Sequence, residues 1–228
     1  MKKFFIVMGL PRSGTTAVRT ALDSHSQLKC EHELFNEENY NDNKPWSERE
    51  VEDILAHLKT VDGVHHNYDL PRLANRELVW DGLKKMTTHV VLVDRPKALD
   101  VFLSTFFAIK YNHWHDWVGD KYNTAKEDIP DALEITHDQN FPLASDFEEF
   151  LTRWTPQRLA MHEEVKSFKS HTIVDYEEFS RYTGRELRRI QEYLDVPFER
   201  IVPRTKKFNR QTKITNIEEL KEIQNRLN

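Results

Sequence analysis

Three short apolar runs interrupt an otherwise polar chain, and each has the length of a strand. They lie at residues 4–8, 90–93 and 172–174 and contain many β-branched side chains. Continuous runs of this kind are typical of strands buried on both faces. Apolar positions at helical spacing follow the first two runs, over residues 17–24 and 99–109. Strands alternating with helices predict an α/β fold, a three-layer αβα arrangement around a short parallel sheet.

Polar residues mark the starts of further helices. A capping box pairs a Ser, Thr or Asn with a Glu three residues later, and each side chain bonds the other's backbone N–H. The sequence contains this spacing at Ser47 with Glu50, Ser145 with Glu148, Thr183 with Glu186 and Asn216 with Glu219. Pro156 is expected to break a helix or begin a turn within residues 145–169, because proline cannot donate a helical hydrogen bond.

Composition narrows the class of protein. With 228 residues the chain has room for one ordinary domain, and we predict a single domain over residues 1–228. Apolar residues at 38% and aromatic residues at 11% are too many for a disordered chain. Lys and Arg total 33 against 38 Asp and Glu, a net charge of −5, which argues against a general nucleic-acid or membrane-surface binder.

The single cysteine and the apolar residues 4–10 indicate where in the cell the protein is expected. Cys30 alone can form neither an internal disulfide nor a multi-cysteine zinc site, which fits a reducing cytoplasm. Residues 4–10 are too short for a signal peptide and lead into Pro-Arg-Ser-Gly-Thr-Thr instead of a cleavage site. No apolar run approaches the roughly 20 residues that cross a bilayer. We therefore expect a cytoplasmic protein without a membrane span.

Residues 9–16, Gly-Leu-Pro-Arg-Ser-Gly-Thr-Thr, connect the first predicted strand to the first predicted helix. Backbone N–H groups and the positive end of a helix dipole favour an anion at such a position. Gly14 lets the backbone approach the anion closely, and Arg12 adds a fixed positive charge. Further donors are the hydroxyls of Ser13, Thr15 and Thr16. The loop therefore predicts a site for a phosphate-like group.

The nucleotide P-loop, G-x-x-x-x-G-K-[ST], is the nearest common pattern. Gly9 and Gly14 match it, but Thr15 stands where the lysine belongs. That lysine reaches the β and γ phosphates of a nucleoside triphosphate. The bound anion is therefore predicted not to be ATP or GTP, although a nucleotide or nucleoside kinase with a divergent loop remains the alternative.

The same loop resembles the 5′-phosphosulfate loop of sulfotransferases that use 3′-phosphoadenosine 5′-phosphosulfate (PAPS), including tyrosylprotein and bacterial carbohydrate and lipid sulfotransferases. Residues similar to those of tyrosylprotein sulfotransferases continue at Arg19, Leu22, Asp23, His25, Cys30 and Glu33. The resemblance implies a P-loop NTPase-like sulfotransferase fold, PAPS as donor and 3′-phosphoadenosine 5′-phosphate (PAP) as product. It also implies that residues 12–16 hold the 5′-phosphosulfate and that Arg12 stabilises the leaving phosphate.

The resemblance extends to a site for the 3′-phosphate. In the family an arginine that ends a strand and a following serine hold this group, and Arg95 and Ser104 match them. Ser104 lies nine residues after Arg95, one more than the commoner spacing. Lys207 and Arg210 belong to a basic run that is either a lid over the 3′-phosphate, as the family's closing segment implies, or a solvated loop. Variable acceptor-side segments are expected at about 37–80 and 110–145.

Sulfuryl transfer also needs a base for the acceptor hydroxyl. Glu33 matches the second glutamate of the family's Glu-Glu pair, and either burial or the neighbouring Glu31 would raise its pKa. His32 is an alternative base, because a histidine titrates near neutral pH without any shift. Lys84 either assists from a neighbouring strand or caps the edge of the sheet.

Other residues have less specific interpretations. Phe208 or Trp114 would stack on adenine or belong to the core. The pairs His65-His66 and His113 with His115 suggest a metal, but they lack the acidic framework of a tight site, so none is expected.

These observations predict a metal-independent sulfotransferase with Glu33 as general base. Its acceptor is a hydroxyl or amine on a small molecule, glycan, lipid or peptide, and nucleic acid is not expected as a partner. A module that binds PAP without turnover is the remaining alternative.

Overall fold

The structure is a computed structural model that describes residues 3–36, 44–68, 75–111, 116–117, 130–136, 146–206 and 212–227. The chain divides into two compact units. Unit 1 consists of Met1–Asp94 and Ala160–Pro203, and unit 2 of Arg95–Leu159 and Arg204–Asn228. Action of the whole chain as a single domain stays a prediction. Within the described ranges, none of the helices combines the length and the apolar character that crossing a membrane requires.

Unit 1 is built on a five-stranded sheet in the order β2-β3-β1-β4-β7. Its strands are β1 (Phe5–Gly9), β2 (Cys30–Glu31), β3 (Gly63–Asn67), β4 (His89–Asp94) and β7 (His171–Asp175). Every neighbouring pair is parallel, and β1 sets the register by pairing Val7 with His65 of β3 and with Val91 of β4. The carboxyl ends of all five strands therefore lie at one edge, where α/β proteins bind ligands.

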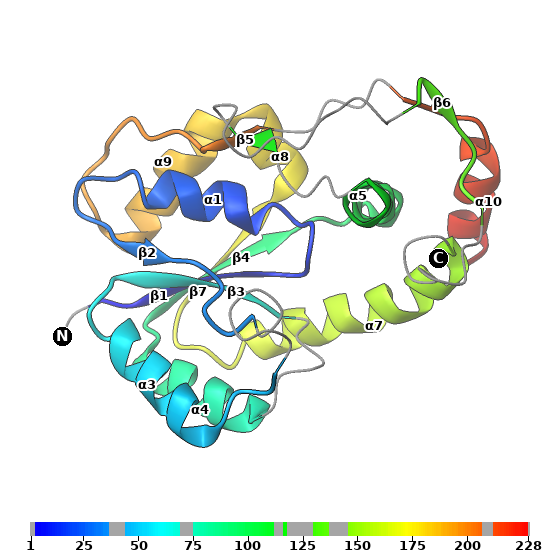
Figure 1. The fold of residues 1–228 in the computed structure, drawn as a ribbon. Helices are drawn as coiled ribbons and strands as arrows, with labels where there is room; N and C mark the ends of the chain where they lie inside the picture. The colour runs from blue at the N-terminus through cyan, green and yellow to red at the C-terminus, as the bar shows by residue number, and fades with distance from the viewer. Residues whose placement is uncertain are drawn as a thin grey trace. The chain divides into compact units, whose positions relative to one another are not determined.

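Helices cover both faces of this sheet. Figure 1 shows α1 (Thr15–Leu22), α8 (Tyr176–Arg181) and α9 (Thr183–Leu194) on one face. The helices α3 (Glu48–Leu58) and α4 (Arg76–Met86) lie on the other face. The three-layer α/β arrangement with a parallel sheet, expected from the apolar runs, is confirmed.

The core of unit 1 follows from the sequence pattern. All five residues of β1 are buried, and so are all but the first residue of β4, because both strands are covered on two faces. Apolar side chains of α1, α8 and α9 pack between these helices and the face of the sheet that they cover. They include Val18, Leu22, Phe179, Leu187, Ile190 and Leu194. Burying each of the larger side chains contributes about 1.5–3 kcal/mol, and these contacts hold α1 against the carboxyl end of β1.

The predicted helix starts have different outcomes. The capping box of Ser47 and Glu50 is present at the start of α3. Thr183 does not cap α9, because its hydroxyl donates to the carbonyl of Phe179 at 2.8 Å. Asn216 lies just before α10 (Ile217–Leu227), and its amide bonds both backbone groups of Ile135. Ser145 lies outside the described residues.

Two elements of unit 1 were not expected. Strand β3 lies in the interior of the sheet, although it falls in the 37–80 segment that the sequence marks as variable. Lys84, expected either to assist from a neighbouring strand or to cap the edge of the sheet, lies on α4 and pairs with Glu164 at 2.5 Å. The buried positions Val79 and Leu83, four residues apart, carry the helical spacing of α4.

Unit 2 contains α5 (Ala98–Lys110), α10 and most of α7 (Phe147–Val165), whose C-terminal end belongs to unit 1. Its short strands pair as β5 (Asp116–Trp117) with β8 (Thr205–Lys206) and β6 (Ala132–Leu133) with β9 (Lys213–Ile214). The ring of Phe102 packs against Phe147 and Phe150, with centroid separations of 4.9 and 5.4 Å.

The predicted break at Pro156 was wrong. Helix α7 continues through Pro156. Both Pro156 and Thr152, whose carbonyl loses its intrahelical donor, are exposed, so water can bond that carbonyl.

Candidate active site

Residues 9–16, which connect β1 to α1 and are called the anion loop below, have a backbone conformation suited to binding an anion. Gly14 is the N-cap of α1 with a φ of 97° and makes no side-chain capping bond. Arg12 also has a positive φ, of 67°. The N–H of Ser13 donates to the carbonyl of Leu10 at 3.1 Å, which closes the turn. A helix start without a side-chain cap leaves its first N–H groups to a ligand, as the sequence predicted for this loop.

The hydroxyl of Ser13 strengthens this interpretation. Ser13 is 3% exposed, and its Oγ has no hydrogen-bond partner among the residues that the structure describes. A Cβ added at Gly9 would lie 2.4 Å from that Oγ and 2.7 Å from the carbonyl oxygen of Val93. A buried donor without a partner costs free energy, and a phosphate oxygen would supply the missing bond. The loop therefore fits the phosphate-like group that its sequence predicts.

The carboxyl of Glu33 lies beyond the end of β2, two positions after the last residue of that strand. Its side chain is 17% exposed. Asn36 donates to Oε2 at 3.2 Å, and Nε2 of His65 lies 3.4 Å from Oε1. Burial raises the pKa of Glu33, while the bond from Asn36 and the charge of Arg19 oppose that rise. Glu33 is thus a half-buried carboxyl with a raised pKa, which makes it a stronger proton acceptor than a solvated glutamate.

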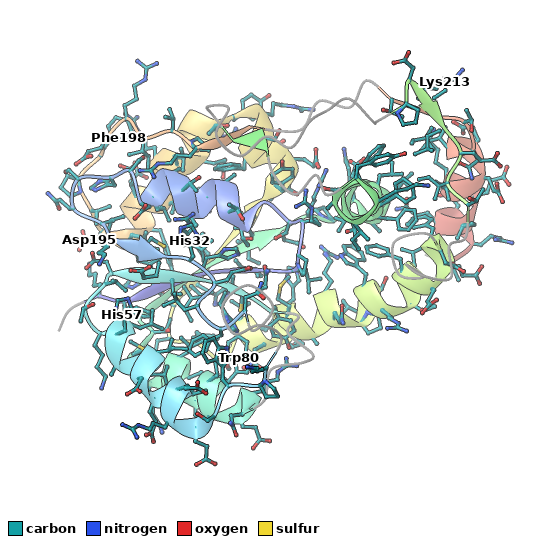
Figure 2. All side chains as sticks on the ribbon, in the orientation of Figure 1. His32, His57, Trp80, Asp195, Phe198 and Lys213 are labelled. Atoms are coloured by element: carbon teal, nitrogen blue, oxygen red, sulfur yellow. The ribbon has the colours of Figure 1, made fainter. Side chains whose placement is uncertain are left out.

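The neighbours of Glu33 face other partners. Glu31 lies 3.3 Å from Nε2 of His57 and 3.7 Å from Nζ of Lys29. Of the two causes considered for a raised pKa at Glu33, burial is therefore the one the structure supports. His32, labelled in Figure 2 close to β2, is exposed.

The comparisons with known proteins agree with this geometry. The sequence profile of the Sulfotransferase family matches residues 4–122, which is more than half of the chain. The chain belongs to the sulfotransferase family. The matched range contains the anion loop, Glu33 and both predicted 3′-phosphate residues, Arg95 and Ser104.

One curated relative and two solved structures extend this finding. Protein-tyrosine sulfotransferase A of Caenorhabditis elegans is 24% identical over 235 residues, which cover 94% of this chain and 56% of the relative. The chain thus spans little more than half the length of that relative. A sulfotransferase from Alicyclobacillus acidocaldarius has a TM-score of 0.57 at 12% identity, covering 100% of this chain and 91% of that one. A mouse sulfotransferase solved with PAP has a TM-score of 0.53 at 12% identity, covering 100% and 64%. The two structures confirm the P-loop-like αβα fold of sulfotransferases.

The remaining site residues that the sulfotransferase resemblance implies belong to unit 2. Arg95 directly follows β4 and is 8% exposed, and Ser104 is a half-buried residue of α5. Lys207 and Arg210 lie outside the described residues, as do Phe208, Trp114 and the pair His113 and His115. Their contacts with a nucleotide stay predictions.

Two contacts near the anion loop were not predicted from the sequence. The ring of Tyr176, at the start of α8, lies against Gly14. Nε2 of His162 lies 3.1 Å from Oδ2 of Asp94, the last residue of β4. Asp94 is the last residue of β4 and Tyr176 directly follows β7. Both therefore lie at the edge of the sheet where α/β proteins bind ligands.

The two adjacent histidines of β3 have separate surroundings. His65 faces Glu33, whereas the ring of His66 lies 5.0 Å from that of Trp80, which is labelled on α4 in Figure 2. Burial and the charge of Arg76 lower the pKa of His66 to about 4. Among the described residues, no three His, Cys, Asp or Glu side chains are grouped so that they could hold a metal ion.

Proposed function

We propose that this protein is a PAPS-dependent sulfotransferase in which Glu33 is the general base and Arg12 stabilises the leaving phosphate. The observation that carries the proposal is the position of Glu33. Its half-buried carboxyl follows β2 at the same edge of the parallel sheet as the loop that follows β1. A base and an anion loop at one edge allow two substrates to react in register.

The chemistry assigned to these residues balances without a metal. Glu33 takes the proton of the acceptor hydroxyl as the acceptor oxygen forms its bond to sulfur. The bond between sulfur and the bridging phosphate oxygen breaks, and its electron pair leaves with PAP. Arg12 stabilises the negative charge that grows on this oxygen, a contribution that becomes larger as the bond breaks.

The nucleotide contacts are divided among the predicted residues. Ser13, Gly14, Thr15 and Thr16 would hold the 5′-phosphosulfate, and the buried hydroxyl of Ser13 supports this assignment. Arg95 and Ser104 would hold the 3′-phosphate, and Lys207 and Arg210 would close over it. An arginine suits this task because its planar fork bonds two phosphate oxygens at once.

The acceptor proposed for the first test is a tyrosine in a peptide. The curated relative is by name a protein-tyrosine sulfotransferase, and the phenol of tyrosine ionises at about pH 10, well below an aliphatic alcohol. A carboxyl with a raised pKa is a better base for such a hydroxyl than an unperturbed one. The other proposed acceptors are a small phenol or other small molecule, a sugar, a lipid alcohol and an amine. Location in the cytoplasm also remains part of the proposal.

Calorimetric titration with PAP, and separately with ATP and Mg²⁺, tests the donor class. Binding of PAP that is lost in Arg95→Ala supports the proposal, and Mg²⁺-dependent binding of ATP alone would indicate a kinase. Transfer of labelled sulfate from PAPS to the acceptors tests the activity. Binding of PAP without transfer to any acceptor would indicate a binding module.

Two neighbouring carboxyls allow a matched comparison of the base. Glu33→Gln should bind PAP as the wild type does and lose about 10²–10⁴-fold in kcat, the usual contribution of a general base. Glu31→Gln changes a carboxyl two residues away that faces His57 and Lys29, and it should transfer at the wild-type rate. Equal rates for Glu33→Gln and the wild type would refute Glu33 as the base.

A further inference from the structure

His65 lies on β3, an interior strand, near the edge of the sheet that is formed by the carboxyl ends of the strands. Strand β3 lies between β2 and β1, and His65 pairs with Val7 while Asn67 pairs with Gly9, the first residue of the anion loop. His65 is 5% exposed. A polar ring this deeply buried needs polar partners, because its nitrogens lose water on folding.

The alternation of side chains along β3 separates His65 from His66. Neighbouring residues of a strand point to opposite faces of the sheet. His66 contacts the rings of Phe35 and Trp80, with centroids 6.1 and 5.0 Å away. Phe35 belongs to the same loop as Glu33, so its contact with His66 helps to fix that loop over the end of β3. His65 is left on the opposite side of β3.

Each oxygen of the Glu33 carboxyl has a polar neighbour: a hydrogen-bond donor at Oε2, and at Oε1 an imidazole at ion-pair distance without the geometry of a hydrogen bond. Nε2 of His65 approaches Oε1 to 3.4 Å, and Asn36 donates to Oε2 at 3.2 Å. The N–H of Asn36 also donates to the carbonyl of Glu33 at 3.0 Å, so the loop folds back on itself. Each carboxylate oxygen accepts more than one hydrogen bond, which leaves lone pairs for the proton of an acceptor.

Among the described residues, charged and titratable groups face Glu33 from β3 and from α1. His65 approaches from β3, and the charge of Arg19 acts from α1. Arg19 is itself buried and lies 3.8 Å from Asp23. The bond from Asn36 and the positive charge of Arg19 favour the ionised form of this half-buried carboxyl, which is the form that can accept a proton.

We infer that His65 is the positioning residue of the base, holding Oε1 of Glu33 so that the ionised carboxylate is presented to the acceptor hydroxyl. This inference rests on the proposed function of Glu33. Without the imidazole, Oε1 loses a positively polarised partner, the carboxylate is less well ordered, and more protons compete for it as the pH falls.

Kinetics over a range of pH test the inference. His65→Ala should lower kcat about tenfold while PAP affinity stays unchanged, because orientation of the base is lost and the nucleotide loop is intact. The acid limb of its kcat/KM profile should move to higher pH, since removing a positively polarised group 3.4 Å from Oε1 raises the pKa of the carboxyl. His65→Gln, whose amide can donate to Oε1, should recover most of the rate.

A second carboxyl–histidine pair provides the matched control. His57 lies 3.3 Å from Glu31 in the same unit, as His65 lies near Glu33, but His57 is half exposed. His57→Ala should leave kcat and the acid limb as they are in the wild type. A change of kcat and acid limb in His57→Ala equal to that in His65→Ala would overturn the inference.

Nuclear magnetic resonance of the imidazole provides a readout that needs no turnover. Glu33→Gln removes the negative charge 3.4 Å from Nε2, so the nitrogen resonance of His65 Nε2 should move relative to the wild type. An unchanged resonance of His65 Nε2 in Glu33→Gln would overturn the inference even if His65→Ala fails to fold.

The outcomes separate this inference from the proposed function. Loss of transfer in Glu33→Gln with a wild-type profile in His65→Ala would keep the base and refute its positioning by His65. Full transfer in Glu33→Gln would refute the base itself, and with it the positioning role.

Discussion

The ring of Tyr176 lies so close to Gly14 that a methyl group at Gly14 would stand 2.2 Å from Cδ2 of the ring. Tyr176 begins α8, directly after β7, and Gly14 begins α1 after β1. The start of one helix is thus packed on the start of another across the carboxyl edge of the sheet. This packing fixes the backbone of Gly14 with its φ of 97°, a conformation in which only glycine is unstrained.

Gly14→Ala is expected to lower the free energy of unfolding by about 1–3 kcal/mol, because it combines a positive φ with a steric overlap. Urea denaturation measures the change. Gly184→Ala is the control: Gly184 lies in the first turn of α9 with nothing within 4 Å of an added Cβ, so alanine there should stabilise by about 0.5–1 kcal/mol. Equal stability of the two variants would contradict the role assigned to Tyr176.

Ser13→Ala should separate stability from ligand binding. The Oγ of Ser13 is buried without a partner among the described residues, so its removal should leave the free energy of unfolding unchanged or raise it by up to about 1 kcal/mol. PAP affinity should fall about fivefold, the value of roughly 1 kcal/mol for one hydrogen bond.

Thr20→Val is the control for Ser13→Ala. The hydroxyl of Thr20 donates to the carbonyl of Ala17 at 3.1 Å inside α1. Its loss should lower stability by about 1 kcal/mol and leave PAP binding unchanged. Weaker stability with intact PAP binding in Ser13→Ala would count against a ligand at its Oγ.

The sequence predicted the parts of the fold that depend on local pattern. Continuous apolar runs identified β1, β4 and β7, and the loop after β1 was recognised because Gly, Ser and Thr stand together at a helix start. Strand β3 was missed because its Gly-Val-His-His-Asn sequence has only one apolar side chain, and its burial depends on the neighbouring strands.

In the candidate site, too, the sequence revealed single residues but not the contacts that depend on the tertiary fold. Glu33 was identified through the family resemblance, but its partner His65 was considered only as a metal ligand together with His66. The two residues are 32 positions apart in the chain, and only the parallel pairing of β2 with β3 brings their segments together. The useful signal was the position of the histidines near the carboxyl end of a strand, which requires that the strand be recognised first.

Arg12→Ala distinguishes transition-state stabilisation from simple phosphate binding. An arginine that acts on charge developing during bond cleavage should affect kcat more than affinity for the product. We expect a loss of about 10²–10³-fold in kcat and a loss in PAP affinity of less than about tenfold. Rapid-quench kinetics and calorimetry measure the two quantities. Equal losses in both would assign Arg12 to phosphate positioning alone.

The raised pKa of Glu33 also predicts how stability changes with pH. A carboxyl whose pKa is higher in the folded than in the unfolded state binds protons more tightly when folded. Its contribution is fully favourable below the unfolded pKa and is lost as the pH rises through the folded one. Glu33→Gln, which cannot ionise, should therefore have a higher Tm than the wild type at pH 7.

The difference in Tm should shrink as the pH falls through the raised pKa of the wild-type carboxyl, because the carboxyl then becomes protonated. Thermal unfolding of both proteins at a series of pH values measures it, and Glu31→Gln controls for replacing a carboxyl in the same segment. A Tm advantage of Glu33→Gln that grows toward acid pH would show that the pKa of Glu33 is lowered in the folded protein. That result would mean that Arg19, Asn36 and His65 outweigh burial and make Glu33 a weaker base than the proposed mechanism requires.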